Sequence, residues 1–186
     1  MSNTPTPNKQ ALKELNTQLK KLETELIAAK KVASMDDYLD IKVTTNQSHS
    51  KRVQVVGNKD KGVGEFFIEL EITAKKSDVY IPLSVASGKK PTGFVYQIEG
   101  TGEGLISTAA AKWRGAGVTE VTMGTLHYVK IPVSKTAIIV VQITIKGSIG
   151  KSYNLTITVI NFKLSPSDAR YKQHSKTISG HNVLLS

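Results

Sequence analysis

The first part of the chain carries an apolar repeat that is typical of a helix. Leucine or alanine recurs at alternating spacings of three and four residues, at Leu12, Leu15, Leu19, Leu22, Leu26, Ala29 and Ala33. This is the a/d repeat of a coiled coil, kept for about three heptads. Residues 10–33 contain no Gly or Pro, and Thr6-Pro7 is typical of a helix start. The pattern predicts one amphipathic helix over residues 7–33, about 40 Å long.

The apolar stripe of this helix predicts a contact. A stripe on an otherwise polar helix is stable only when another surface covers it. Two partners fit the pattern: the rest of the same chain, or a second copy in a coiled coil. Leucine at both a and d does not choose between two, three and four helices. The predicted assembly residues are Leu12, Leu15, Leu19, Leu22, Leu26 and Ala29.

After Asp36-Asp37 the apolar period changes to two, which is typical of strands with one face on a core. The clearest alternation is at Phe66, Ile68, Leu70 and Ile72, and Leu39, Ile41 and Val43 show it too. Further strands are expected at residues 79–83, 94–99, 105–108, 118–123, 126–131, 137–146, 153–164 and 182–185.

The connections between these segments favour an antiparallel arrangement. Gly147-Ser148-Ile149-Gly150 predicts a hairpin, since glycine stands at both ends of a four-residue connection. The apolar run 138–141 predicts a central strand, and residues 58–64 and 87–93 are expected to be turns. Short strands at regular spacing without intervening helices predict a sandwich. We therefore expect a mainly β fold, with the helix in residues 1–35 and an antiparallel sandwich in residues 36–186.

The charge is concentrated in the β-region. The net charge is +10, whereas residues 1–40 contain six lysines and six acids. This excess favours a solvated lysine surface or attraction to a polyanion such as an acidic surface polymer. Only three arginines stand against 22 lysines, and no aromatic platform is evident, which argues against nucleic acid.

The residue types that carry chemistry are scarce or scattered. There is no cysteine, which excludes disulfides, thiolate metal sites and a cysteine nucleophile. The four histidines lie outside any metal-ligand spacing, and no nucleophile elbow or phosphate-binding loop is present. No apolar run is long enough to span a bilayer. We therefore nominate no catalytic, cofactor-binding or metal-binding residue, and expect no cofactor.

The only tryptophan is the strongest candidate for a partner contact. It lies in Lys112-Trp113-Arg114, between small residues, where an aromatic ring beside a guanidinium has the composition of an interface anchor or sugar platform. The alternative is an aromatic residue of the core or its rim at the end of a strand.

The strand pattern resembles that of immunoglobulin-like domains of bacterial surface and secreted proteins. Residues 66–83 (FFIELEITAKKSDVYIPL) give a long alternating strand, a charged break and a second strand that ends in Ile-Pro. The resemblance covers residues 38–186 and implies an adhesive, spacer or assembly role without a cofactor. It also implies an extracellular or cell-surface location, although the polar start Met1–Pro5 is unlike a signal peptide. A virion appendage with a helical stalk is the alternative location.

These observations favour a non-enzymatic structural, assembly or adhesion protein. The helix would self-associate or dock, and the β-region would contact a partner. Two other classes stay open: a polyanion- or nucleic-acid-binding module driven by the basic β-region, and a hydrolase whose residues assemble only in space.

Overall fold

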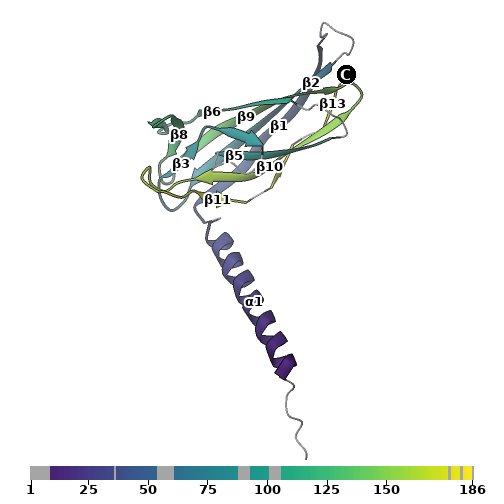
Figure 1. Ribbon diagram of the computed structural model, residues 1–186. Coiled ribbons are helices and arrows are strands. Elements are labelled where there is room, and N and C mark those ends of the chain that lie inside the picture. The colour runs from purple at the N-terminus through teal and green to yellow at the C-terminus, as the bar shows by residue number, and fades with distance from the viewer. Residues whose placement is uncertain are drawn as a thin grey trace, which may run out of the picture. The chain divides into compact units, whose positions relative to one another are not determined.

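One helix precedes a remainder made of strands, as the change of apolar period predicts. The computed structural model describes residues 9–35, 37–53, 61–87, 93–100, 106–175, 177–180 and 182–185. The chain divides into two units, Met1–Ser34 and Met35–Ser186. The fold class is mainly β, with antiparallel sheets after one N-terminal helix (Figure 1).

The predicted helix is confirmed. Helix α1 (Lys9–Met35) is 27 residues long and consists mainly of strong helix formers. It ends two residues beyond the expected end at residue 33. The expected start at Thr6-Pro7 lies outside the described residues.

The described part of the β-unit contains more strands than the sequence pattern predicts. The three extra strands, β4, β11 and β12, have only two or three residues, too few to show a period of two. The strands are β1 (Leu39–Val53), β2 (Lys61–Ala74), β3 (Val79–Pro82), β4 (Val85–Ser87), β5 (Phe94–Gly100), β6 (Ile106–Arg114), β7 (Thr119–Met123), β8 (Leu126–Ile131), β9 (Thr136–Ser148), β10 (Ser152–Phe162), β11 (Lys172–His174), β12 (Ile178–Ser179) and β13 (Val183–Leu184).

The longest strands form one antiparallel sheet in the order β1-β2-β9-β6. Alternate residues of β2 and β9 point inward, so that Phe66 lies opposite Ile143 and Leu70 opposite Ile139, all fully buried. The apolar run 138–141 lies in β9, between β2 and β6, which confirms the predicted central strand.

The predicted hairpin at Gly147–Gly150 is wrong. Strand β9 pairs with β2 and β6, whereas β10 pairs with β5 and with β11, β12 and β13, so the connection passes from one sheet to another. Both edges of β9 are already occupied, and β10 therefore cannot pair with it. The fully buried ring of Tyr153 packs at the place where a side chain on Gly147 would lie.

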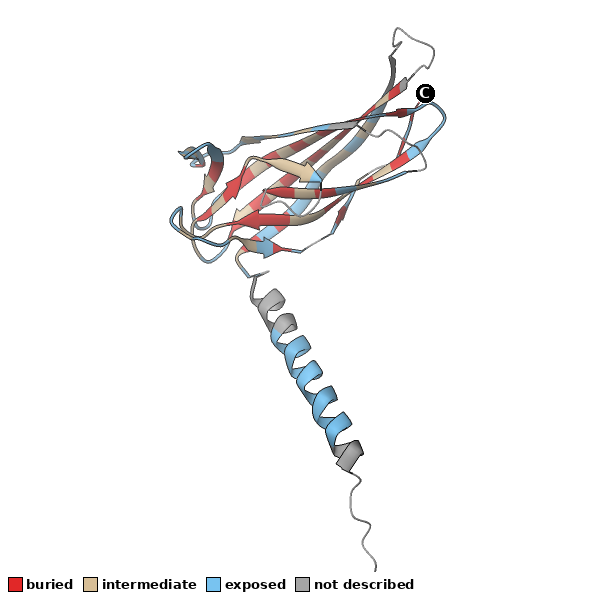
Figure 2. Ribbon diagram, in the orientation of Figure 1, coloured by how far each residue is buried: buried red, intermediate tan, exposed pale blue. Residues whose placement is uncertain are grey.

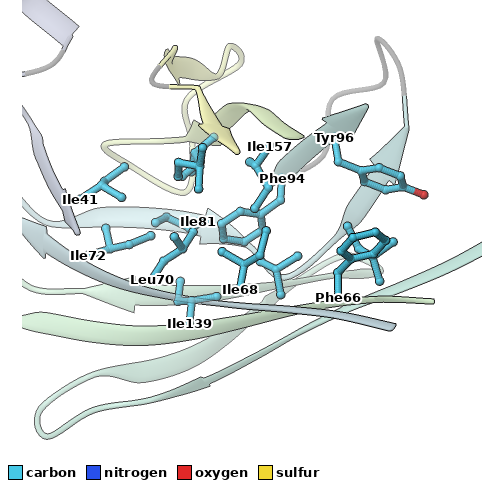
Figure 3. Packing of buried hydrophobic residues seen from close by; sticks show 14 of the residues in the cluster. Ile41, Phe66, Ile68, Leu70, Ile72, Ile81, Phe94, Tyr96, Ile139 and Ile157 are labelled. Atoms are coloured by element: carbon cyan, nitrogen blue, oxygen red, sulfur yellow. The ribbon is translucent and has the colours of Figure 1, made fainter. Parts of the chain in front are cut away.

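Two further sheets complete the β-unit: β11-β10-β5-β4, with β12 and β13 also on β10, and β3-β8-β7. Within the second sheet β4 and β5 are parallel, which departs from the expected all-antiparallel pairing. Residues of all three sheets belong to one buried apolar cluster. Figure 3 shows Ile68, Leu70 and Ile139 of the first sheet near Phe94 and Ile157 of the second.

The C-terminal segment closes the β1 side of the sandwich. Asn46 Nδ2 donates a hydrogen bond to the Ser179 carbonyl at 2.6 Å, and Ser48 Oγ donates to the Asn182 carbonyl at 3.0 Å. Leu185 is fully buried. Its side chain lies beside Gly62 and Gly64 of β2, where any larger residue would collide with it. The expectation of a turn at residues 58–64 is therefore wrong for residues 61–64, which belong to β2, and residues 58–60 lie outside the described residues.

Candidate binding surfaces

The leucine stripe of the helix is exposed within the helical unit. Leu15, Leu19, Leu22 and Leu26 are 55–63% exposed (Figure 2). The side chains of Leu12 and Ala29, the other two predicted assembly residues, lie outside the described residues.

The opposite face of the helix is polar. Thr17 and Thr24 lie seven residues apart, and their hydroxyls donate to the carbonyls of Lys13 and Lys20 at 2.9 and 2.8 Å. These bonds satisfy the hydroxyls locally. Within residues 13–27, whose side chains the structure describes, the apolar residues therefore lie on one side, apart from Ile27.

The predicted contact residues Lys112, Trp113 and Arg114 form the end of strand β6. Because side chains alternate along a strand, the three do not share a face. Trp113 lies opposite the buried Ile139 and packs against the core, whereas Lys112 and Arg114 are exposed on the outer face. The tryptophan is thus a rim aromatic, as the alternative interpretation expects.

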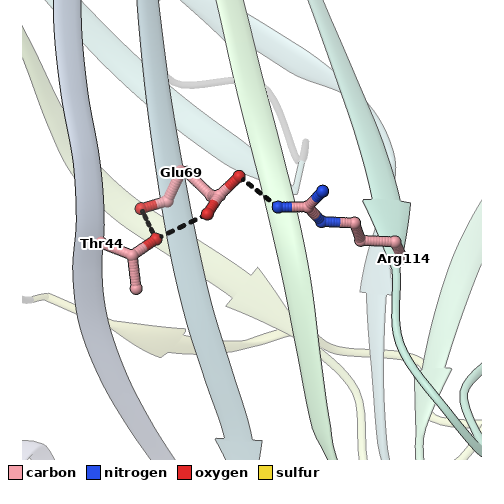
Figure 4. Close-up of polar contacts among 3 residues, drawn as sticks. All are labelled: Thr44, Glu69 and Arg114. Atoms are coloured by element: carbon pink, nitrogen blue, oxygen red, sulfur yellow. Dashed lines mark hydrogen bonds and ion pairs between the residues drawn. The ribbon is translucent and has the colours of Figure 1, made fainter.

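Arg114 is held by an ion pair on the outer face of the first sheet. Its Nη2 donates to Glu69 Oε2 at 2.9 Å, and Thr44 Oγ1 donates to Glu69 Oε1, also at 2.9 Å (Figure 4). The arginine side chain is 66% exposed and that of Glu69 21%. Ion pairs of this exposure contribute at most about 1 kcal/mol. Their main effect here is to fix the direction of the guanidinium across three strands.

Trp113 lines a surface hollow of about 480 Å³ between β6 and the third sheet. The hollow is also lined by Leu83, Ala111, Lys112, Glu120 and His127. Trp113 Nε1 donates to Glu120 Oε2 at 3.1 Å, and Glu120 Oε1 lies 2.7 Å from His127 Nδ1.

These contacts set the charge of the hollow. The hydrogen bond from the Trp113 indole, followed by the contact with His127, holds the pKa of the Glu120 carboxyl below its usual value. Sequence reasoning missed Glu120 and His127 because the β7–β8 pairing brings them beside Trp113. The hollow combines the apolar residues Leu83, Ala111 and Trp113 with one carboxylate, one imidazole and one lysine. Within the described residues no group of His, Asp and Glu is suited to hold a metal ion.

Two lysines of the β-unit lie against partners of different kinds. Lys130 forms an ion pair with Asp78 at 2.9 Å. Lys163 Nζ lies 5.9 Å from the Tyr128 ring centre and 5.0 Å from that of Tyr171. Burial, helped by the hydrogen bond to Tyr128, raises the pKa of Tyr171 to about 12. The carboxylate of Asp78 thus neutralises Lys130, and the rings of Tyr128 and Tyr171 cover Lys163.

Comparison with known proteins adds no relationship. No protein-family model, curated protein sequence or solved structure matches the chain. Of the described residues, no helix is both long enough and apolar enough to cross a membrane.

Proposed function

We propose that this chain is a non-enzymatic assembly protein. Its helix joins copies of the chain in a coiled coil, and its β-unit is the head that contacts a partner. The exposed stripe of Leu15, Leu19, Leu22 and Leu26 carries this proposal. Covering each leucine removes apolar surface from water, which is the main favourable term in association.

The repeat favours a second copy as the partner of the stripe. A helix that packs on a globular core usually has a broad apolar face, whereas a strict a/d stripe is the narrower seam of a coiled coil. Among residues 13–27 the only apolar side chain off the stripe is Ile27. Identical stripes fit one another, because the a and d side chains of each helix can insert into the spaces between the side chains of the other.

The β-unit supports the role of a head because it has its own buried core. The resemblance to immunoglobulin-like domains favours adhesion or assembly at a cell surface, or on a virion, as the setting. The candidate contact region is the end of β6, with Lys112 and Arg114 on the outer face and Trp113 in the adjoining hollow.

The solution mass of two chains tests the proposal. The full chain is compared, at micromolar concentration, with a truncated chain that starts at Asp36 and keeps the core of the β-unit. We expect an oligomer for the full chain and a monomer for the truncated one, with unchanged far-ultraviolet circular dichroism of the strands. A monomer in both cases overturns the proposal.

A further inference from the structure

Strand β6 presents a long strand edge that the described chain leaves open. Its nine residues pair with β9 on one side. On the other side, none of its backbone groups forms a hydrogen bond with any residue that the structure describes. Alternate N–H and C=O groups of an edge strand point outward and can bond to another strand. Strand β6 therefore carries a row of donors and acceptors for a further strand.

The other strand edges are shorter or engaged. The opposite edge of the same sheet, β1, is engaged by the C-terminal segment through Asn46 and Ser48. Strand β4, the edge of the facing sheet, has three residues and pairs only with β5. Strand β7 has five residues and pairs only with β8. Of the described edge strands, β6 is thus the longest whose outer side forms no hydrogen bond with another described segment.

Most of β6 lacks the features that keep strand edges apart. Natural edges are protected by lysine, proline, bulges or a covering segment. Residues 106–111 contain no charge and no proline, and Ala109, Ala110 and Ala111 follow one another at the centre. Pairing of β6 with β9 is continuous over all nine residues, without a register shift. The strand is therefore regular, with small side chains on both faces.

We propose that β6 pairs antiparallel with β6 of a second copy. Pairing all nine residues fixes the register, since Ile106 then lies opposite Arg114 of the second copy and Ala110 lies on the two-fold axis. The four-stranded sheets of the two copies would join into one continuous eight-stranded sheet. Such a contact uses the same surface of both copies and closes as a dimer.

This register is free of like-charge contacts. On the outer face Lys112 lies opposite Thr108 of the second copy, and Ala110 opposite Ala110. On the inner face Ala111 lies opposite Ala109. A second copy therefore meets neither repulsion nor bulky side chains at the centre of the contact.

The inference goes beyond the proposed function, since it adds a second contact between copies in the β-unit. A single strand edge buries little surface and is expected to associate weakly by itself. Copies that the helix already holds together would pair more completely, because tethering raises the effective concentration of the edges. The truncated chain that starts at Asp36 isolates the edge contact from the helix.

Charge changes at Thr108 test the register in the truncated chain. Thr108→Glu places a carboxylate opposite Lys112 twice per dimer, and Thr108→Lys places a second amine there. We expect Thr108→Glu to tighten the dimer about fivefold and Thr108→Lys to weaken it about fivefold, by sedimentation up to millimolar concentration. The same two changes at the exposed Thr119 in β7 control for net charge. Equal effects at both positions, or none at Thr108, would overturn the pairing.

A cysteine cross-link gives an independent test that needs no strong association. The chain has no cysteine, so a single introduced thiol can pair only between copies. Directly opposed residues of an antiparallel pair have Cα atoms about 4.5–5.5 Å apart, within the range of a disulfide. Under mild oxidation Ala110→Cys should form a disulfide dimer in full and truncated chains, and Thr119→Cys should not.

The outcomes separate the two proposals. A cross-link through residue 110 in the truncated chain supports edge pairing whether or not the helix assembles. If Ala110→Cys cross-links no faster than Thr119→Cys in either chain, edge pairing is wrong, and the mass of the full chain still reports on the helix. Added peptides give a further outcome. If the disulfide at residue 110 forms more slowly only in the presence of peptides whose sequence is unrelated to β6, the edge accepts a foreign strand rather than a second copy, which also overturns the proposal.

Discussion

Replacement of Leu22 by glutamate tests the helix contact with a magnitude that follows from the structure. Leu22 is 62% exposed within the helical unit. Full burial of a leucine contributes about 2 kcal/mol, so covering this fraction contributes about 1.2 kcal/mol per chain. A dimer loses this term twice, about 2.4 kcal/mol, and a buried carboxylate adds to the loss. We therefore expect Leu22→Glu to raise the dissociation constant at least about 50-fold, at about 1.4 kcal/mol per tenfold change.

Ile27 supplies the matched control. It is 67% exposed, as apolar as Leu22 and in the same helix, but it lies off the stripe. Ile27→Glu should change the dissociation constant less than about fivefold, as is usual for exposed substitutions. Sedimentation equilibrium over a range of concentrations measures both variants, and circular dichroism checks that both keep their helix. Equal weakening by the two substitutions, or no effect of either, would refute the assignment of the stripe as the contact.

Three further predictions concern the β-unit. Ile139→Ala, at a fully buried position of the central strand, should lower the free energy of unfolding in urea by about 2–5 kcal/mol, and a loss under about 1 kcal/mol would contradict its place in the core. Tyr153→Phe should keep or raise that free energy by about 1 kcal/mol, because the buried hydroxyl has no hydrogen-bond partner within the described structure; a clear loss would reveal a partner. Hydrogen bonds from Lys130 and from the Val133 N–H lower the pKa of Asp78, so its contribution to stability is present above its ordinary pKa of 3.8 and is lost as the pH falls through the lower folded pKa. Asp78→Asn should therefore be less stable than the native chain at pH 7, with a gap that closes in acid; a gap that persists at low pH would exclude this cause.

The sequence predicts the elements well because their periods are long and regular. The seven apolar residues of the stripe, spaced three and four apart, suffice to predict α1. Strict alternation from Phe66 to Ile72 predicts β2 and its buried face. The central place of β9 follows from its apolar run. These features depend on neighbours in the chain, which the sequence presents directly.

The sequence does not predict which strands pair. Glycines at both ends of residues 147–150 suit a hairpin, but β9 already has two partners, so the chain crosses to the other sheet. That outcome depends on β2 and β6, far away in the sequence. The strand at the C-terminal end was predicted, whereas its covering of Gly62 and Gly64 was not, because only the close approach of Leu185 requires glycine there.

For the candidate site, too, the sequence predicts local features but not the contacts between distant segments. Trp113 was singled out for its rarity, and the structure places it in a hollow. Its neighbours Glu120 and His127 come from a different sheet and leave no local signal beyond the need of the indole N–H for an acceptor. Because side chains alternate between the two faces of β6, the side chain of Trp113 lies on the face opposite to those of Lys112 and Arg114. In a loop the three side chains would not be separated in this way.

Amide hydrogen exchange of residues 13–27 in the full chain tests the central claim most directly. A helix whose leucines are buried in a coiled coil opens rarely, so its amides are expected to exchange slowly, with protection that rises with protein concentration. The truncated chain supplies no signal here, and Leu22→Glu should remove the protection. Fast exchange at every concentration, equal in the native chain and in Leu22→Glu, would contradict the account.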